Sequence, residues 1–293
     1  MILVTGAAGK TGKAVIEAVA RGGQVGCTEV RPLVHRAKQA AEVAALGAHD
    51  VTVGRFDDAE ALARAVSGVT AIYHICPNVS PHEMAYAKAV VAAAKAAGVR
   101  RLVYHSVLHP QIEAMPHHWA KLRVEEMLLA SGLDVTTLQP TAYMQNILAG
   151  WRSIVEDGVY RVPYPVETRI SLVDLGDVAQ AAALVLTEPG HGGATYELVG
   201  TAPLTQTEVA EALSAALRRP VRAVAEPVEA WEASARAASM GDYQRDTLAA
   251  MFRSYAESGL VGNSNALGWL LGRRPGTLQE FAADAVRGAD TPN

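Results

Sequence analysis

The stretch that decides the fold is the amino-terminal one, Met1-Ile2-Leu3-Val4-Thr5-Gly6-Ala7-Ala8-Gly9-Lys10-Thr11-Gly12. A short apolar run leads into three glycines, and a helix-like segment follows them. Glycines let a backbone turn tightly and approach a pyrophosphate, while the first N–H groups of the helix face the anion. The spacing is G-x-x-G-x-x-G rather than G-x-G-x-x-G. Its place between a strand and a helix predicts a dinucleotide site, the alternative being a turn that merely uses glycine.

Composition and charge exclude several classes of protein. Half of the 293 residues are apolar, and the net charge is −4, which argues against a nucleic-acid surface. The two cysteines, Cys27 and Cys76, suggest no disulfide framework. We find no signal peptide before the first strand, and no apolar stretch of the ~18 residues that a membrane span needs. We therefore expect a soluble cytoplasmic protein without nucleic-acid or membrane partners.

Strand-like and helix-like runs alternate over the first 140 residues, which predicts a Rossmann-type α/β fold with a doubly wound parallel sheet. A glycine closely follows each expected helix, as helix C-caps favour. The expected strands are Ile2–Thr5, Val30–His35, Asp50–Gly54, Ala71–Ile75, Arg101–Ser106 and Asp134–Gln139. The expected helices are Lys10–Ala20, Ala37–Leu46, Ala59–Ser67, Met84–Ala97 and Trp119–Ala130.

The pattern changes after Pro140. We predict an NADP(H)-binding domain over residues 1–140, with a segment at about 170–199 returning to its sheet, and a smaller helix-rich substrate lobe over 141–293. The expected helices there are Thr141–Val155, Asp177–Thr187, Thr205–Leu217 with Thr205 as its cap, and most of Val228–Leu271. The expected strands are Ile170–Leu175, Thr195–Val199 and Val221–Ala225.

The end of the second strand meets the adenosine ribose in a dinucleotide fold. An acidic residue there would favour NAD(H), but the chain has Arg36, with Arg31 and Lys38 nearby. An arginine suits a 2′-phosphate, so we predict NADP(H), the alternative being a solvated arginine at a strand end. After the third strand, Asp57 or its neighbour Asp58 would either accept from the adenine amino group or cap the next helix.

The ends of the later strands supply further candidates, because strand C-termini line the ligand crevice of such a sheet. Cys76 and Pro77 follow the fourth strand, and we expect their backbone beside the nicotinamide ribose. Cys76 is expected to be a small apolar contact rather than a nucleophile. Ser106 ends the fifth strand and is placed to bond a carbonyl or a ribose hydroxyl. Tyr143 follows the sixth strand in a segment suited to the wall of a substrate pocket.

Lys121 is the candidate for binding the nicotinamide ribose. In ordinary short-chain dehydrogenases a tyrosine four residues earlier donates the proton, but that position is His117 here, and no tyrosine occurs from Gln111 to Lys121. His117 or His118 would be a substitute acid, since histidine titrates near neutrality, or the two form a surface pair. A zinc site is not expected, because the histidine spacings match no compact zinc pattern.

Several of these motifs together resemble the NmrA-like branch of the atypical short-chain dehydrogenases, and its type-2 quinone oxidoreductase and triphenylmethane reductase subgroup. The resemblance spans most of the chain, with residues 225–260 matching least. It rests on the opening Thr5–Gly12, Arg36, Ser106–His109, Lys121 with Val124–Leu128, Gln139-Pro140 with Tyr143–Asn146 (Gln139 replacing the usual arginine), and Asn263–Leu267 with Leu271–Arg273. It implies a Rossmann-type fold, NADP(H) binding and a cleft between two lobes.

Residues and resemblance together predict an NADPH-dependent reductase. It would transfer hydride to a quinone-like or other electron-poor aromatic or conjugated small molecule, with Lys121 on the ribose and Ser106 or Tyr143 orienting the acceptor. The product oxyanion would take its proton from solvent, His117 or His118. One alternative is a non-catalytic NADP(H)-sensing regulator that binds a protein partner. Another, an isomerase or epimerase with bound NAD, conflicts with Arg36 and the missing tyrosine. A homodimer is compatible with either of the first two.

Overall fold

The computed structural model describes residues 1–22 and 28–289, so Cys27 and the expected frayed tail 290–293 lie outside the described residues. The chain divides into two compact units. Unit 1 comprises Met1–Glu113, His118–Gln139 and Val178–Tyr196, and unit 2 comprises Ala114–His117, Pro140–Asp177 and the chain from Glu197 onward. That unit 1 holds the cofactor and unit 2 the acceptor stays a prediction.

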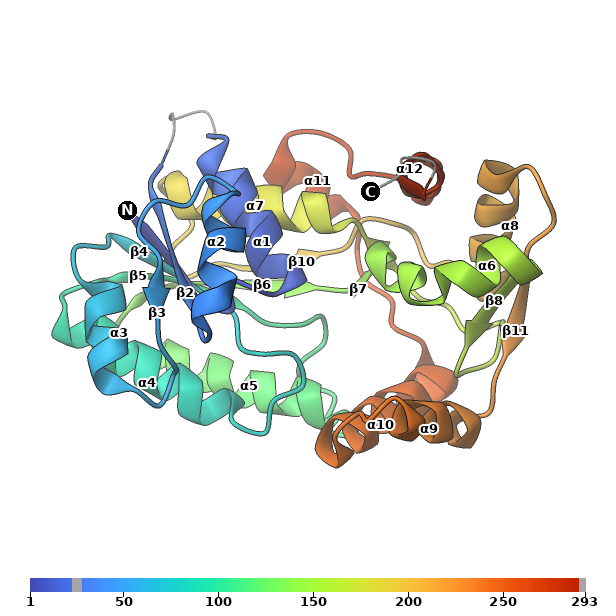
Figure 1. Ribbon diagram of the computed structural model, residues 1–293, viewed down its shortest axis with the longest axis horizontal. Coiled ribbons are helices and arrows are strands. Elements are labelled where there is room, and N and C mark those ends of the chain that lie inside the picture. Colours follow the sequence, from blue (N-terminus) through green and yellow to red (C-terminus); the bar gives the residue numbers. More distant parts are fainter. Residues whose placement is uncertain (23–27, 290–293) are drawn as a thin grey trace. The chain divides into compact units, whose positions relative to one another are not determined.

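A seven-stranded sheet forms the centre of unit 1, with the order β10-β6-β5-β4-β1-β2-β3 (Figure 1). Its strands are β1 (Ile2–Val4), β2 (Val30–Val34), β3 (Thr52–Val53), β4 (Ala71–His74), β5 (Arg101–His105), β6 (Asp134–Pro140) and β10 (Thr195–Leu198). Neighbouring strands from β3 through β1 to β6 are parallel, and Leu3 pairs with both Arg31 and Ile72. The strand order reverses at β1, which creates a crevice outside the carboxyl ends of β1 and β4.

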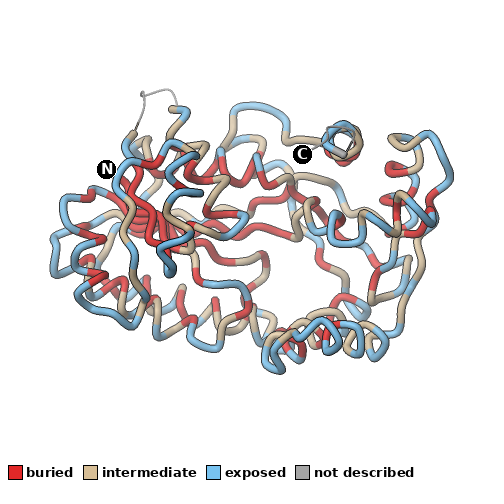
Figure 2. The backbone as a smooth tube through the Cα atoms, in the orientation of Figure 1, coloured by how far each residue is buried: buried red, intermediate tan, exposed pale blue. Residues whose placement is uncertain are grey.

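Helices cover both faces of this sheet, as Figure 1 shows. One face carries α1 (Lys10–Ala20), the 3₁₀ turn η1 (Ala37–Gln39) with α2 (Ala40–Ala44), and α7 (Leu175–Thr187). The other carries α3 (Ala59–Val66), α4 (Glu83–Ala96) and α5 (Pro116–Leu129). A core of buried aliphatic side chains, including Leu3, Ile72 and Leu102, fills the space beneath α3, α4 and α5. The central strands β1, β2 and β4 are accordingly buried along their length (Figure 2), whereas the edge strands β3 and β10 are more exposed.

The predicted Rossmann-type α/β fold is confirmed. The six expected strands and five expected helices of the first 140 residues are all present, with bounds that differ by a few residues. The glycines expected to end these helices have positive φ, as a left-handed C-cap requires: Gly22, Gly47, Gly68, Gly98 and Gly132. Local pattern therefore suffices for this part of the chain.

Unit 2 contains two small parallel sheets and most of the remaining helices. Strand β7 (Ala142–Tyr143) pairs with β9 (Leu172–Val173), and β8 (Val159–Val162) pairs with β11 (Arg222–Ala225). The helical elements are η2 (Met144–Gly150), α6 (Trp151–Asp157), α8 (Gln206–Leu217), α9 (Val228–Ala237), α10 (Asp242–Ser258), α11 (Asn265–Leu271) and α12 (Leu278–Ala289). None of the helices in the described part of the chain combines the length and apolar character that crossing a bilayer requires.

One expectation for residues beyond 140 is wrong. The helix expected over Thr141–Val155 is a strand, a 3₁₀ segment and a short α-helix, because Tyr143 is extended and Gly150 interrupts the helical backbone at φ −102° and ψ 12°. Of the segment at about 170–199, β10 joins the main sheet and Val178–Tyr196 belongs to unit 1, whereas β9 pairs with β7. The Thr205 cap is confirmed: the Glu208 N–H donates to the Thr205 hydroxyl at 3.2 Å.

Candidate functional site

The glycine-rich turn lies between β1 and α1, at the carboxyl edge of the sheet. Gly6 has a φ of +58°, and a Cβ there would lie 2.7 Å from the Ile75 carbonyl oxygen. A Cβ on Gly12 would lie 2.4 Å from the Gly6 carbonyl oxygen, closer than side chains approach backbone. Glycine is required at both positions, because the turn packs directly on the first turn of α1 and on the end of β4.

Helix α1 begins at this turn without a side-chain cap. Gly9 is the N-cap, supplies no capping hydrogen bond, and the first turn holds no acidic residue. Gly9 and Lys10 are exposed. The positive end of the helix dipole therefore faces outward, beside a turn in which Gly6 and Gly9 have no side chains. This arrangement suits an anion. These residues fit the diphosphate of a dinucleotide.

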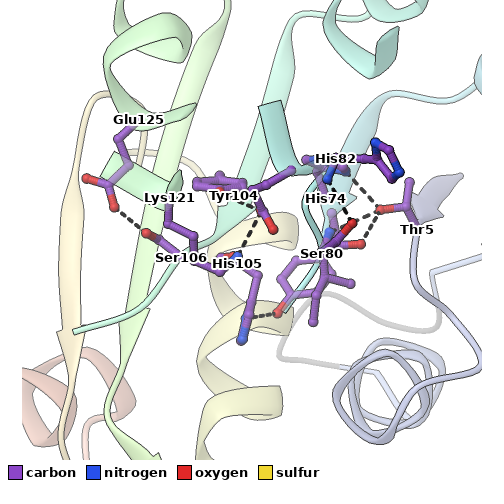
Figure 3. Close-up of polar contacts among 12 residues, drawn as sticks. Thr5, His74, Ser80, His82, Tyr104, His105, Ser106, Lys121 and Glu125 are labelled. Atoms are coloured by element: carbon purple, nitrogen blue, oxygen red, sulfur yellow. Dashed lines mark hydrogen bonds and ion pairs between the residues drawn. The ribbon is translucent and has the colours of Figure 1, made fainter. Parts of the chain in front are cut away.

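Thr5 fastens the turn to the neighbouring strand. Its hydroxyl accepts from the Ile75 N–H at 3.0 Å and donates to the Ile75 carbonyl at 3.1 Å. The same oxygen lies 3.0 Å from Nδ1 of the fully buried His74 (Figure 3). Because the Thr5 hydrogen is used on Ile75, Nδ1 of His74 carries the hydrogen of that bond. Burial lowers the pKa of His74 to about 4, so the imidazole is neutral at pH 7.

An exposed arginine follows β2. Arg36 and Lys38 are both exposed there, where the 2′-phosphate of NADP(H) is expected. Arg31, noted near Arg36 in the sequence, is buried, pairs with Asp50 at 2.6 Å and donates to the Ser67 carbonyl at 2.5 Å. Its side chain therefore connects β2 to the end of α3.

Of the two aspartates after β3, Asp58 is a helix cap. Its carboxylate accepts from the Ala61 N–H at 2.9 Å at the start of α3. Asp57 is exposed and forms two hydrogen bonds with Arg55, at 2.8 and 2.9 Å. The hydrogen bond from Arg55 lowers the pKa of Asp57. Asp57 as the partner of the adenine amino group stays a prediction.

Cys76 and Pro77 follow β4, as expected. The Cys76 side chain is buried, and burial raises the pKa of its thiol far above the ordinary value. A neutral thiol is a poor nucleophile, in keeping with a small apolar contact. Pro77 is exposed at the strand end. Their contact with the nicotinamide ribose stays a prediction.

Lys121 lies in a buried polar cluster with Glu83 and Tyr104, which we call the Lys121 cluster. The Lys121 ammonium donates to Glu83 Oε1 and to the His105 carbonyl, each at 2.9 Å, and lies 5.1 Å from the centre of the Tyr104 ring (Figure 3). The Tyr104 hydroxyl also donates to Glu83 Oε1, at 2.8 Å. Lys121 is only 4% exposed and Glu83 2%. Its charge is therefore balanced inside the protein, and its contact with a ribose stays a prediction.

Glu83 remains ionised in this cluster. Burial alone would raise its pKa, but the Lys121 ammonium and the hydrogen bonds from Lys121 and Tyr104 together outweigh burial and lower the pKa to about 2. The buried carboxylate and ammonium neutralise each other's charge. Removal of either group would leave the other as an unpaired charge inside the protein.

Ser106 lies at the end of β5 and is bound to a second glutamate. Its hydroxyl donates to Oε1 of Glu125 on α5 (Figure 3), and Gln139 on β6 donates from Nε2 to both Glu125 oxygens at 3.0 Å. Ser106 is buried, whereas Glu125 is partly exposed. Burial raises the pKa of Glu125 despite these hydrogen bonds.

The two histidines at the start of α5 differ in their surroundings. His118 is fully buried, and its Nδ1 donates to the His109 carbonyl at 3.2 Å. Burial lowers its pKa to about 4, so it is neutral at pH 7, which argues against His118 as a proton donor. His117 is half-buried and belongs to unit 2. Over residues 1–22 and 28–289, no three acidic, histidine or cysteine side chains gather into a metal-binding group.

Burial of His74 and His118 makes stability depend on pH. Burial lowers the pKa of each to about 4, against 6.5 in the unfolded chain. The unfolded state therefore takes up protons first as the pH falls, and this stability is present above 6.5 and lost towards 4. Between pH 7 and 5 we expect each histidine to remove about 2 kcal/mol from the free energy of unfolding.

Urea unfolding at the two pH values measures this loss. The variants His74→Gln and His118→Gln should each reduce it by about 2 kcal/mol. His35→Gln, at an exposed position, is the control and should leave it unchanged. An identical pH dependence in all four proteins would contradict the assignment.

Tyr143 lies in unit 2, in β7, where it pairs with Val173 of β9. The next segment is fixed by Gln145, whose amide donates to Asp174 at 2.7 Å and accepts from the Leu175 N–H at 3.0 Å. Gln145 and Asp174 also line a pocket of about 360 Å³ inside unit 2. The role of Tyr143 at an acceptor stays a prediction.

The sequence analysis did not assign roles to Glu83 and Glu125. Glu125 lies four residues after Lys121, one helical turn along α5, and this spacing was a usable signal. Glu83 had no comparable signal, because its partner Lys121 is 38 residues away in the sequence. Only the packing of α4 and α5 on the sheet brings these two side chains together.

The glycine turn, the uncapped helix and the exposed arginine after β2 define a Rossmann-type dinucleotide-binding protein. Comparison with known proteins gives the family. The chain belongs to the NmrA-like family, whose model matches residues 1–282. The family recognised from the sequence motifs is thereby confirmed.

Three relatives show how far the likeness extends. The NAD(P)H azoreductase of Xenophilus azovorans is 31% identical over 96% of both chains. Quinone oxidoreductase 2 of Escherichia coli (strain K12) is 30% identical over 96% of both chains, and its structure complexed with NADPH matches 98% of this chain and 100% of that chain with a TM-score of 0.85 and 29% identity. The triphenylmethane reductase of Citrobacter sp., complexed with NADP(H), covers 97% of this chain and 99% of its own, with a TM-score of 0.84 and 25% identity.

Proposed function

We propose that this protein is an NADPH-dependent reductase that transfers hydride to a quinone-like or other electron-poor conjugated small molecule. It is an NAD(P)H-dependent oxidoreductase of the NmrA-like family. The observation that carries the proposal is the uncapped start of α1 behind Gly6, Gly9 and Gly12, together with the exposed Arg36 after β2. The first fits a diphosphate and the second a 2′-phosphate.

The relatives support the nature of the acceptor. Their names describe reduction of azo compounds, quinones and triphenylmethane dyes, and two of their solved structures hold NADPH or NADP(H). These acceptors share a flat, conjugated and electron-poor framework. An acceptor of that class needs orientation and exclusion of water more than it needs covalent help from the protein.

Different residues of the chain would bind the cofactor and orient the acceptor. NADPH, when bound, supplies the hydride. Backbone N–H groups of the turn and Arg36 hold its phosphates, and Ser106 at the end of β5 orients the acceptor or the ribose. The Lys121 ammonium, fixed by Glu83, contributes positive potential close to Ser106.

A single set of assays tests the proposal. Purified protein is mixed with NADPH, and the absorbance of the reduced nicotinamide is followed with and without naphthoquinones, azo dyes and cationic triphenylmethane dyes. We expect loss of the signal that depends on both protein and acceptor. Tight NADPH binding without turnover on the whole panel would overturn the proposal and favour an NADP(H)-sensing regulator.

The preference for NADPH over NADH is expected to depend on Arg36. The variant Arg36→Glu replaces a cation with an anion where the 2′-phosphate is expected, and its KM for NADPH should rise about 30-fold or more. The KM for NADH should change little, because NADH has no such phosphate. The control is Arg21→Glu, an exposed arginine at the far end of α1 that pairs with Glu17. Equal changes for both cofactors would argue against a 2′-phosphate site at Arg36.

A further inference from the structure

The two glutamates near the ends of β4 and β5 have opposite electrostatic surroundings. Glu83 pairs with the Lys121 ammonium, and Lys121 and its hydrogen bonds outweigh burial to lower its pKa. Glu125 receives hydrogen bonds only from the neutral Ser106 hydroxyl and the neutral Gln139 amide, and burial raises its pKa. Environments that push the pKa values of neighbouring carboxyls apart mark the one that carries a proton.

The contacts of Glu125 accommodate both of its protonation states. As a carboxylate it accepts from Ser106 at Oε1 and from Gln139 at both oxygens. As a carboxylic acid protonated at Oε1 it donates to the Ser106 oxygen, while Gln139 still donates to Oε2. An arginine in place of Gln139 would favour the carboxylate alone. The neutral partners on each side therefore keep Glu125 hydrogen-bonded both before and after it releases a proton.

We infer that Glu125 and Ser106 form a relay that delivers a proton to the reduced acceptor, an inference that rests on the proposed function. The acceptor gains a hydrogen and two electrons as hydride, which leaves a quinone oxygen negative. That oxygen forms a bond to the Ser106 hydroxyl hydrogen as the Oγ–H bond breaks. Ser106 Oγ takes the carboxyl proton of Glu125, and the Glu125 carboxylate is reprotonated from solvent, to which its side chain is partly open.

The other titratable groups near Glu125 and Ser106 have hydrogen-bond partners of their own. Two charged or titratable side chains face Glu125: Lys121 from the same helix and Tyr104 from β5. The Lys121 ammonium is engaged by Glu83 and the His105 carbonyl, and the Tyr104 hydroxyl donates to Glu83. Burial raises the pKa of Tyr104 well above its ordinary value. Glu125 is thus the group in this set whose proton is not held by a fixed hydrogen bond to a buried ion pair, and burial raises the pKa of its carboxyl.

The choice of acceptor separates proton delivery from hydride transfer. A quinone becomes an anion when it takes hydride and needs a proton, whereas a cationic triphenylmethane dye becomes neutral and needs none. The variant Glu125→Gln keeps the size and polarity of the side chain but cannot donate an acidic proton. We expect kcat for a naphthoquinone to fall about 30-fold or more and kcat for the dye to stay within about threefold. Ser106→Ala removes the other member of the relay and should lower kcat for the naphthoquinone as well.

A second readout does not depend on turnover. Carbon-13 NMR titration of the glutamate carboxyls, with the Glu125 signal assigned from Glu125→Gln, should give a midpoint above the ordinary glutamate value of 4.5. The matched control is Glu126→Gln, the next residue, which is exposed and pairs with Arg123. It should change neither acceptor's kcat.

Three results would overturn the relay. One is an equal loss of quinone and dye reduction in Glu125→Gln, which would indicate a structural role. Another is an unchanged quinone rate in that variant. The third is a Glu125 titration at or below the ordinary value. If the wild-type protein reduces neither acceptor, the proposed function fails and the relay with it, an outcome that differs from a lost selectivity between acceptors.

Discussion

Replacement of Glu83 by leucine is expected to cost about 3–5 kcal/mol of the free energy of unfolding. Glu83 is 2% exposed and accepts from both the Lys121 ammonium and the Tyr104 hydroxyl. Without the carboxylate, Lys121 keeps a charge inside the protein with no anionic partner, beside the His105 carbonyl and the Tyr104 ring. Chemical unfolding of purified Glu83→Leu and wild-type protein at pH 7 measures the loss.

The double variant Glu83→Leu/Lys121→Met is the control. It removes both charges, and the groups that lose a partner, the Tyr104 hydroxyl and the His105 carbonyl, are neutral. It should therefore recover at least half of the stability that Glu83→Leu loses. A single variant within about 1 kcal/mol of wild type, or a double variant less stable than the single one, would contradict the buried pair.

The Glu83–Lys121 pair makes the stability of the fold depend on pH in the acid range. The pKa of Glu83 is lowered to about 2 from an ordinary value of 4.5. Its contribution to stability is therefore complete above pH 4.5 and is lost as the pH falls towards 2. The buried histidines lose theirs earlier, between pH 6.5 and 4. Acid unfolding should accordingly begin with the histidines.

The substitution Gly12→Ala is expected to raise the Kd for NADPH about 100-fold or more, a loss of about 2.7 kcal/mol. The added Cβ would lie 2.4 Å from the Gly6 carbonyl oxygen and 2.8 Å from Cα of Ala7. Both neighbours are backbone atoms, so the turn must move away from α1, and the N–H groups that face the diphosphate move with it. Titration of NADPH by nicotinamide fluorescence measures the affinity.

Gly150→Ala is the matched control, because a Cβ at Gly150 meets no atom within 4 Å and the backbone φ there is negative. It should bind NADPH as wild type does. Circular dichroism and unfolding of Gly12→Ala establish whether the variant is folded. A folded Gly12→Ala protein with affinity within about threefold of wild type would place the dinucleotide elsewhere.

The first 140 residues could be predicted closely because their signals are local. Each strand is a short apolar run, and each helix ends at a glycine that takes a positive φ. The glycine turn and Arg36 follow directly from their positions at strand ends. Beyond Pro140 the signals are no longer local. Strands β7 and β9 are brought together by tertiary packing, and each has only two paired residues, which is too short for a distinct sequence pattern.

Helix α12 lies beyond the last helix expected from the sequence, although a local signal for it exists. Thr277 and Glu280 form a capping box: the Glu280 N–H donates to the Thr277 hydroxyl at 3.2 Å, and the Thr277 N–H donates to Glu280 Oε2 at 2.8 Å. Thr205 and Glu208 form the same pattern at the start of α8, where Thr205 alone was predicted as the cap.

The candidate site shows the same difference between local and long-range signals. Ser106 and Lys121 were predictable from their places after β5 and in α5. The contacts that define their chemistry were not, since Glu83 meets Lys121 across 38 residues of sequence and Gln139 meets Glu125 from a different strand. Sequence position indicates which residues reach the site, whereas burial and partners determine which of them hold a charge.

The stereochemistry of hydride loss tests the central claim most directly. NADPH deuterated at C4 on one face or the other is oxidised by the protein with the acceptor that it reduces fastest, and the deuterium left in NADP⁺ is measured by mass spectrometry. A reductase that holds the cofactor in one orientation should yield fully deuterated NADP⁺ from one form and unlabelled NADP⁺ from the other. Partial labelling from both forms, or no acceptor-dependent oxidation, would contradict the account.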